Sequence, residues 1–390
     1  MGEWSHFRLT FLPVRTSPER ECAFPAMVRA RTVNKFCYPF IRASIVTVFI
    51  IVFIEGILLL TAPETSIENV AQKLNESGRH FAVFACSTPD QKSHRAFDYA
   101  FYLPLTALAW RRIGFESIVL IIGEKSEWKN HPILSYTLES LNALPHVTVL
   151  FISANVENRG MLSQTARMFL ANMDAFPGVS TDHIMTTDAD LWPLRKEHYY
   201  VPQGIDRSLI LVHSKCCAPF DFAGRSYPMF PMCNIGASAA TWRQIINTNS
   251  SVVAKDPKSI LKYFESFFGE RVHRRVEFAS DDWYLDQNVV SIRIDEWIRR
   301  HGTKDPTYRV SDVGFGRIDR MSWNPQRIRP SNFKFFFDAH LIEEGFIPKK
   351  WLTIRPLLHL MYNKSSWQTN WSNNYAAEFH TRYADWKAKP

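Results

Sequence analysis

The segment that decides the fold reads His183-Ile-Met-Thr-Thr-Asp-Ala-Asp-Leu-Trp-Pro-Leu194. Its apolar first half is typical of a strand, and the proline near its end stops the strand. Asp188 and Asp190 stand at spacing i, i+2, so their side chains point to the same side of an extended segment. Hard cations such as Mg²⁺ and Mn²⁺ prefer oxygen ligands and bridge carboxylates to phosphates, so the pair suits a metal-bound nucleotide diphosphate. A D-x-D triplet arises about once by chance in a chain this long, so its context must decide its meaning.

Residues 43–61 read ASIVTVFIIVFIEGILLLT and are long enough to cross a bilayer as one helix. Glu55 is a costly charge within this stretch, but the polar face of a soluble helix is missing. Residues 1–42 hold seven Lys/Arg against three Asp/Glu, and the positive-inside rule places this tail in the cytoplasm. The sequence therefore predicts a single-pass type II membrane protein with a signal anchor, a stem over 62–79 and a luminal bulk.

The net charge of +8 divides evenly, since the tail carries 7 − 3 = +4 and the remainder +4. This balance argues against nucleic acid as a partner, because a nucleic-acid-binding domain would carry a basic face. Four cysteines would lie in the lumen and allow up to two disulfides: Cys86, Cys216, Cys217 and Cys233. Four N-x-S/T sequons permit a glycoprotein: Asn75, Asn249, Asn363 and Asn370.

Apolar strand-like runs alternate with helical periodicity up to the D-x-D segment. Strands are expected at 80–89, 117–124, 147–154 and 183–187, and helices at 99–115, 132–145 and 163–173. This alternation predicts an α/β fold with a parallel, doubly wound sheet, whose ligands bind beyond the carboxyl ends of the strands. Asp188 and Asp190 lie at that edge.

The second half is less regular. A strand is expected at 208–215, and helices at 259–270 and 375–387. The last helix carries an aromatic stripe on one face: Tyr375, Phe379, Tyr383 and Trp386. Packing of this stripe against the domain is favoured over acceptor or partner binding.

A cytoplasmic tail, a signal anchor, a short stem and an α/β domain with a strand-terminal D-x-D together resemble the Golgi glycosyltransferases of the GT-A fold. The resemblance implies a Rossmann-like mixed sheet with flanking helices, in a luminal catalytic domain over 80–360, followed by a helical extension over 361–390. It also implies Mn²⁺ (or Mg²⁺) and a nucleotide sugar, usually a UDP-hexose. Asp190 would then bind the metal directly, and Asp188 would share the metal and contact the ribose.

Three later segments resemble one branch of that fold, the glycogenin-like and lipopolysaccharide-galactosyltransferase-like retaining enzymes. In Cys233-Asn-Ile-Gly-Ala-Ser238, Asn234 would contact a sugar hydroxyl and Gly236 would allow close approach of the backbone. In Asp281-Asp-Trp-Tyr-Leu-Asp-Gln287, Asp286 and Gln287 would contact the transferred sugar. In Asp338-Ala-His-Leu341, His340 would be the third protein ligand of the metal, although the motif lacks a close Gly and the Pro.

Each of these assignments has a structural alternative. Asn234 would equally suit a turn cap, and His340 a core histidine. Arg167 would reach the nucleotide or form an exposed ion pair. Asp282 is a candidate catalytic base for an inverting reaction, or a helix N-terminal acid favoured by the helix dipole. Sequence does not decide between inversion and retention, and the Asp286–Gln287 resemblance favours retention.

The sequence thus favours a hexosyltransferase of the Golgi or ER membrane that acts on a glycan, glycoprotein or glycolipid acceptor, with a homodimer left open. A non-catalytic sugar-nucleotide- or glycan-binding scaffold of the same fold is the main alternative. A haloacid-dehalogenase-type phosphohydrolase would carry its D-x-D on the first strand. A nucleotidyltransferase would need a glycine-rich loop after the first strand, and Ser87-Thr-Pro-Asp-Gln-Lys92 lacks glycine.

Overall fold

The computed structural model describes residues 78–89, 97–250, 253–274, 280–302, 304–310 and 316–389. The expected tail (1–42), the membrane span (43–61), nearly all of the stem (62–79) and the sequon at Asn75 lie outside these residues. Within the ranges that are described, no helix is long and apolar enough to cross a membrane.

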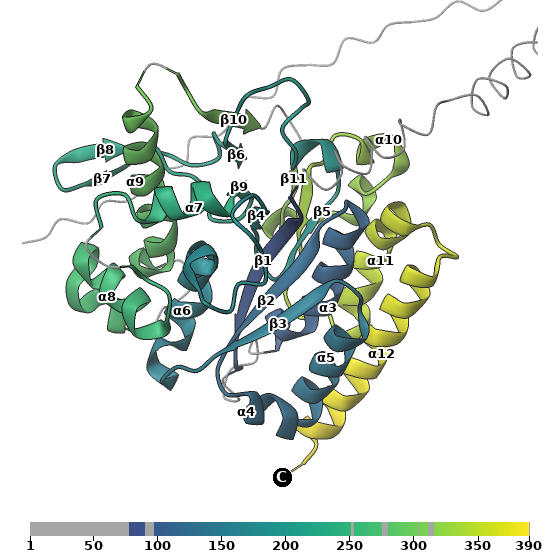
Figure 1. Cartoon of the computed structure of the whole chain (residues 1–390). Helices are drawn as coiled ribbons and strands as arrows, with labels where there is room; N and C mark the ends of the chain where they lie inside the picture. The colour runs from purple at the N-terminus through teal and green to yellow at the C-terminus, as the bar shows by residue number, and fades with distance from the viewer. Residues whose placement is uncertain are drawn as a thin grey trace, which may run out of the picture. The chain divides into compact units, whose positions relative to one another are not determined.

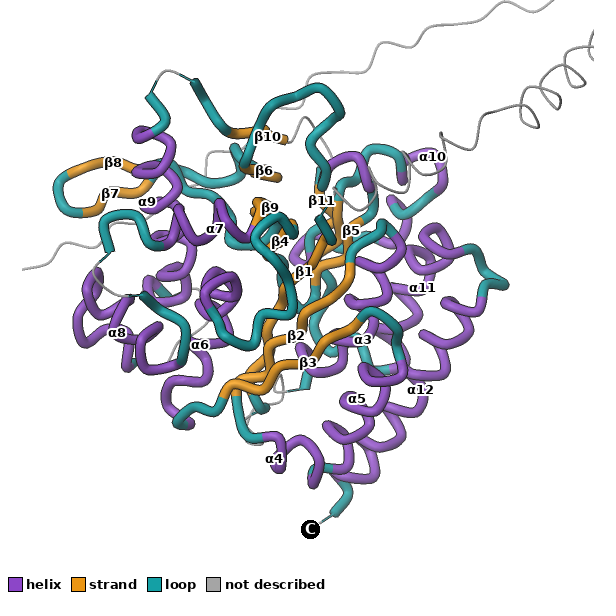
Figure 2. The backbone as a smooth tube through the Cα atoms, viewed as in Figure 1, coloured by secondary structure: helices purple, strands orange, loops and turns teal. Residues whose placement is uncertain are grey.

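A seven-stranded sheet forms the centre of the fold, in the order β10-β6-β9-β4-β1-β2-β3 (Figures 1 and 2). Its strands are β1 (His80–Ser87), β2 (Glu116–Ile122), β3 (Val147–Ile152), β4 (His183–Thr186), β6 (Leu209–Val212), β9 (Ile235–Ser238) and β10 (Thr307–Val310). β9 is antiparallel to both β4 and β6, whereas the other neighbouring strands pair in parallel. The sheet is therefore mixed.

The four strands expected before the D-x-D segment are confirmed. Phe81 of β1 pairs with Glu116 of β2 on one side and with Ile184 of β4 on the other. Residues 117–122 of β2 are all buried, because helices cover both faces of the sheet. The continuous apolar runs that predicted these strands reflect this double cover.

β9 departs from the all-parallel sheet that the alternation predicted. Sequence periodicity reports burial and says nothing of strand direction, so a four-residue antiparallel strand leaves no separate signal. Gly236 lies within it, where an added Cβ would lie 2.5 Å from Met185 Cε and 2.7 Å from His183 Cε1. Glycine thus leaves room for the side chains of β4.

Helices pack in two layers, one on each face of the sheet (Figure 1). One layer holds α3 (Asp98–Arg112), α5 (Pro132–Ala143), α11 (Pro348–Tyr362) and α12 (Trp367–Lys387). The other holds α6 (Arg159–Thr165), α7 (Ala239–Ile246), α8 (Pro257–Phe268) and α9 (Leu285–Arg300). The short helices are α4 (Lys125–Asn130) and α10 (Pro330–Phe333). The helix expected at 163–173 is instead the end of α6 followed by a 3₁₀ segment, Ala166–Asn172.

Two smaller sheets complete the strand set. β11 (Arg317–Ile318), β12 (Asp338–His340) and β5 (Leu191–Pro193) form one, and β7 (Phe220–Phe222) and β8 (Arg225–Tyr227) form the other. The expected strand at 208–215 corresponds to β6, and the expected helix at 259–270 to α8. The sheet that contains β5 adjoins the D-x-D segment.

The aromatic stripe of α12 packs against the domain, which confirms the packing interpretation. Tyr375 and Phe379 are 2% and 0% exposed, and the ring of Phe101 on α3 lies 5.6 Å and 5.0 Å from theirs. Tyr383 and Trp386 lie 5.8 Å and 5.1 Å from the ring of Phe97. α12 begins at Trp367 because the side chain of the preceding serine accepts the N–H of the third helical residue.

Candidate functional site

The D-x-D segment lies between β4 and β5, beyond the carboxyl end of β4. Leu191 N donates to Asp188 O at 3.2 Å and closes a turn. Thr106 Oγ1 on α3 donates to the carbonyl oxygen of Ala189, the buried middle residue of the turn, at 2.6 Å. The two flanking carboxylates, Asp188 and Asp190, consequently border the cavity beyond the strand end.

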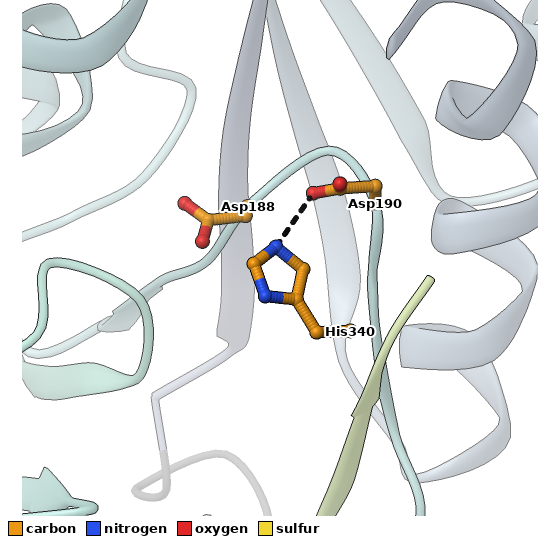
Figure 3. Close-up of side chains that lie close together, drawn as sticks. All are labelled: Asp188, Asp190 and His340. Carbon is orange, nitrogen blue, oxygen red and sulfur yellow. Dashed lines mark ion pairs between the residues drawn. The ribbon is translucent and has the colours of Figure 1, made fainter. Parts of the chain in front are cut away.

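His340 reaches this turn through a strand pairing that is not apparent from the sequence. β12 pairs antiparallel with β5, so His340 lies opposite Leu191. Leu341 N donates to Asp190 O at 2.9 Å and continues the pairing into the turn. His340 and Asp190 therefore face one another although 150 residues separate them in the chain (Figure 3).

Asp188, Asp190 and His340 each offer one ligand atom, and these atoms lie within 4.8 Å of one another. Asp190 Oδ1 is buried and makes no hydrogen bond among the described residues; it faces His340 Nε2 at an ion-pair distance of 3.4 Å. A buried carboxylate oxygen without a donor is costly, and a cation would satisfy it. Two carboxylates and one imidazole fit Mn²⁺ or Mg²⁺, with the remaining positions left for water or phosphate oxygens.

The charges of this cluster are strongly coupled. Burial, the largest effect, would lower the pKa of His340, but the carboxylates of Asp190 and Asp319 outweigh it and raise that pKa to about 9. Burial would raise the pKa of Asp190, but His340 and Arg320 hold it below its ordinary value. In the metal-free protein the protonated imidazole thus stabilises the fold fully below pH 6.5, and this contribution is lost as the pH rises toward 9.

We expect the Mn²⁺ affinity to rise with pH, because an imidazole must be neutral to bind a metal and a cation displaces the proton of His340. The rise should approach about tenfold per pH unit from about pH 7 to 8.5. Calorimetric titration at constant ionic strength measures it. The His340→Asn variant should lose most of the Mn²⁺ affinity and the dependence of that affinity on pH. An unchanged pH dependence would contradict the assignment of His340 as a metal ligand.

Arg320 begins the turn that follows β11 and contacts the same cluster. Its Nη1 donates to Asp190 Oδ2 at 3.1 Å, and its Nη2 lies 2.5 Å from His340 Nε2. The Tyr99 hydroxyl on α3 is a further hydrogen-bond partner of the guanidinium. Arg320 therefore contacts two of the three candidate metal ligands.

Arg167 joins the D-x-D segment to a second acidic residue, Asp286. Its Nη1 lies 2.5 Å from Asp188 Oδ1, and its Nη2 lies 3.3 Å from Asp286 Oδ2. Burial raises the pKa of Asp286 to about 7 in spite of this arginine. Asp286 thus gains and loses a proton near neutral pH, as a general acid or base must.

A cavity of about 510 Å³ lies over these groups, within the size range of small-molecule sites. It extends from Asp188, Asp190 and His340, the candidate metal-ligand cluster, to the start of α9. Side chains that the sequence had not singled out also line it: Tyr99, Trp283, Tyr284, Arg317, Asp319, Arg320 and Met321.

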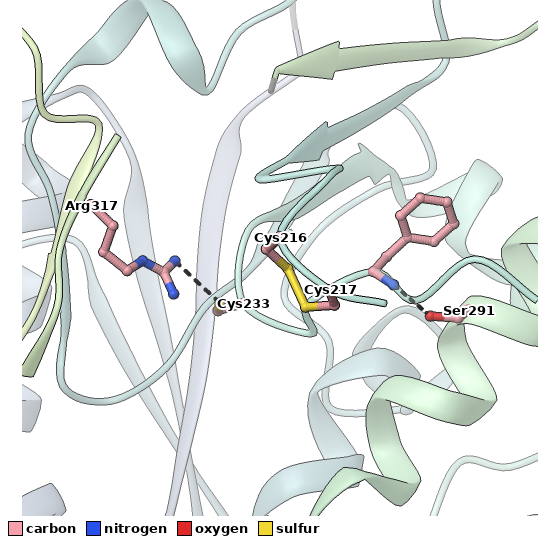
Figure 4. The surroundings of a disulfide bond; sticks show 6 residues. Cys216, Cys217, Cys233, Ser291 and Arg317 are labelled. Atoms are coloured by element: carbon pink, nitrogen blue, oxygen red, sulfur yellow. Dashed lines mark hydrogen bonds between the residues drawn. A yellow bond between two sulfur atoms is a disulfide. The ribbon is translucent and has the colours of Figure 1, made fainter. Parts of the chain in front are cut away.

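All the cysteines of the described residues border this cavity. Cys216 and Cys217 form a disulfide between chain neighbours (Figure 4). Cys86 and Cys233 are free and buried, and burial raises the pKa of each thiol to about 12. These two thiols are therefore poor nucleophiles. One of the two disulfides that the sequence allows is formed.

The candidate catalytic residues separate into two places. Asp286 and Gln287 border the cavity, on the first turn of α9. Asp282 is instead bound by Arg271, whose Nε and Nη2 donate to its Oδ1 at 2.9 Å and 2.7 Å. Asp282 is not among the described residues that line the cavity, so it is a weaker candidate for the catalytic base than Asp286.

Gly236 lies within β9 of the central sheet and Asn234 in the turn directly before it, rather than on the cavity wall. Asn234 is fully buried with φ of 75°, and its Nδ2 donates to Asp338 Oδ2 at 2.7 Å. Gly236 makes its close approach to the side chains of β4. Neither is among the described residues that border the cavity, so their contacts with the donor stay predictions.

Asp338 is the centre of a buried polar network behind the metal-ligand cluster. Arg317 Nε and Nη2 donate to its two carboxylate oxygens, each at 2.8 Å, and His213 Nε2 lies 2.8 Å from Oδ2. Burial would raise the pKa of Asp338, but Arg317 and His213 hold it well below its usual range. This network fixes β12, and β12 carries His340.

The sequence analysis missed Arg317, Asp319 and Arg320. Arg317 and Asp319 flank Ile318, and Arg320 follows directly. A charged residue on each side of one buried apolar residue is a weak strand signal, and it could have suggested a strand end at a site. Tyr99 gave no such signal, because it lies in an otherwise apolar helix.

No known family model matches the chain, and no curated protein matches its sequence. Among solved structures, a mutant of Drosophila β-1,4-galactosyltransferase 7 in complex with manganese, UDP-Gal and xylobiose is similar, with a TM-score of 0.22 and 10% identity. The match covers 60% of this chain and 66% of that chain, slightly less than two thirds of its length. Independently of this similarity, the central sheet of the described residues is a mixed α/β sheet.

Proposed function

We propose that the protein is a metal-dependent glycosyltransferase that moves a hexose from a nucleotide sugar, UDP-linked, to a glycan, glycoprotein or glycolipid acceptor. The observation that carries this proposal is the cluster of Asp188, Asp190 and His340 on the wall of a cavity of about 510 Å³. The cluster lies beyond the carboxyl end of β4, where open α/β sheets bind ligands.

The diphosphate end of the donor would lie against this cluster. Mn²⁺ or Mg²⁺, held by Asp188, Asp190 and His340, would supply positive charge to the diphosphate leaving group. Arg320 presents its guanidinium on the same wall. Arg167 holds Asp188 in place through a buried ion pair and is itself 6% exposed.

Transfer breaks the bond from the anomeric carbon to the diphosphate and forms a bond to an acceptor oxygen, which loses its proton. Asp286 and Gln287 border the cavity beyond Arg167 and would contact the transferred sugar. We favour retention, because Asp286 and Gln287 resemble the Asp-Gln pair of the retaining enzymes. Inversion with Asp286 as the base is the alternative.

The compartment belongs to the same proposal. The apolar stretch over 43–61 would anchor the chain with its catalytic domain in the lumen of the Golgi or ER. Nucleotide sugars and glycan acceptors would then meet the site on that side of the membrane. The homodimer stays open.

A non-catalytic sugar-nucleotide- or glycan-binding protein of the same fold is the second candidate. One observation favours it: Arg167 and Arg320 already neutralise the two carboxylates of the D-x-D segment. Such a protein would bind UDP or a glycan without turnover.

A panel of UDP- and GDP-sugars tests the proposal on the purified full chain. We expect nucleotide release from one donor in the presence of Mn²⁺, and loss of that release with EDTA, because the leaving diphosphate needs the added charge. Release that is equally fast in EDTA would contradict metal dependence. Nucleotide binding without release from any donor, with or without candidate acceptors, would favour the non-catalytic protein.

A further inference from the structure

Arg320 is the one cationic side chain of the described residues whose nitrogens contact both Asp190 and His340. We propose that Arg320 is a built-in competitor of the divalent cation: its guanidinium contacts Asp190 and His340 in the metal-free protein and must move away from them when the cation binds. The inference rests on the metal site of the proposed function and extends it to the control of metal binding.

Arg320 contacts two of the three side chains that would hold the metal. Nη1 donates to Asp190 Oδ2 at 3.1 Å. Nη2 lies 2.5 Å from His340 Nε2, the ring nitrogen that also faces Asp190. At that distance the guanidinium nitrogen occupies the position from which a cation would reach Nε2. A metal bound to that nitrogen would therefore exclude the Arg320 contact.

The charges lead to the same conclusion. Asp188 is paired with Arg167 and Asp190 with Arg320, so two guanidinium groups already balance two carboxylates. Arg167 also contacts Asp286 and the carbonyl oxygen of Thr187, and is nearly fully buried, so it is held in place. Arg320 borders the cavity and has a side chain 14% exposed, so it has space to move. A divalent cation would be repelled by Arg320 in its present position.

The guanidinium also explains how two carboxylates coexist without a metal. Unpaired, Asp190 would be a buried charge, which is strongly destabilising. Arg320 provides the pairing until a cation replaces it. Removing Arg320 should thus lower the stability of the metal-free protein and increase the stabilisation that added metal gives.

The test compares Mn²⁺ binding to the full-chain protein and to Arg320→Gln by titration of the free Mn²⁺ electron paramagnetic resonance signal. We expect Arg320→Gln to bind Mn²⁺ about tenfold more tightly, because one charge-assisted contact no longer has to be broken. The metal-free variant should melt at a lower temperature than the wild type, and added Mn²⁺ should raise its melting temperature by more. Arg320→Lys keeps the positive charge but loses the two-pronged guanidinium, so its Mn²⁺ affinity should lie between those of the wild type and Arg320→Gln.

Arg329→Gln is the matched control, since Arg329 is exposed and nine residues away in sequence; its Mn²⁺ affinity should equal that of the wild type. Equal or weaker Mn²⁺ binding by Arg320→Gln, with a folded protein and a binding wild type, would overturn the competition alone. If neither protein binds Mn²⁺, the result would contradict the metal site, and therefore both the proposed metal-dependent function and this inference.

Discussion

Asp190→Asn should lower metal-dependent nucleotide release by about a hundred- to a thousandfold, a loss typical of removing a group that stabilises charge in the transition state. Asp190 is 3% exposed and is the carboxylate that faces His340. An amide of the same shape keeps the packing of the turn but withdraws one anionic ligand. Mn²⁺ binding should weaken in parallel, measured by calorimetric titration. Circular dichroism should show an unchanged fold.

The matched control for this loss is Asp174→Asn. Asp174 has a side chain 83% exposed and contacts Lys255 at the surface. The same change of Asp to Asn there should leave nucleotide release and Mn²⁺ binding at wild-type values. Full activity of Asp190→Asn would contradict the assignment of the D-x-D segment as a metal site.

Asp338→Asn should destabilise the protein by about 3–5 kcal/mol, because it leaves the guanidinium of Arg317 buried without its anion. Asp338 is fully buried, and Arg317 has a side chain 20% exposed. Urea unfolding followed by tryptophan fluorescence measures the loss. His340 lies two residues along the same strand, so Mn²⁺ binding should also weaken. In the wild type the stabilisation is present above the ordinary carboxyl pKa of 3.8 and is lost on acidification below it.

Asp206→Asn is the control for the buried network. Asp206 pairs with Lys304 at the surface, and exposed pairs contribute little to stability. Its unfolding midpoint should equal that of the wild type. A midpoint for Asp338→Asn that also equals the wild type would contradict the role of this network in holding β12.

The first half of the fold could be predicted because burial leaves a direct trace in the sequence. β1 to β4 are apolar runs that end in polar turns, and each is confirmed. β5, β9, β11 and β12 have two to four residues each, too few to show any periodicity. Their pairing depends on long-range contacts, so only the folded chain reveals that β12 lies against β5.

The candidate site was predictable to a similar degree. Asp188 and Asp190 follow from a local pattern, and they lie within 4.8 Å of His340, the residue chosen by resemblance. Asp282 shows what the sequence could not predict. It lies on the same segment as Asp286, but Arg271 binds its carboxylate and it does not line the cavity. Arg320 illustrates the opposite case: nothing in its neighbourhood of the sequence links it to a residue 130 positions earlier.

The most direct test of the central claim is the position of Mn²⁺ in crystals of the protein grown with Mn²⁺ and UDP. Anomalous scattering locates the metal independently of the coordinates of the protein. We expect one peak within coordination distance of Asp188, Asp190 and His340, with the UDP diphosphate on its cavity side. A peak at other residues, or bound UDP with no metal beside its diphosphate, would contradict the account.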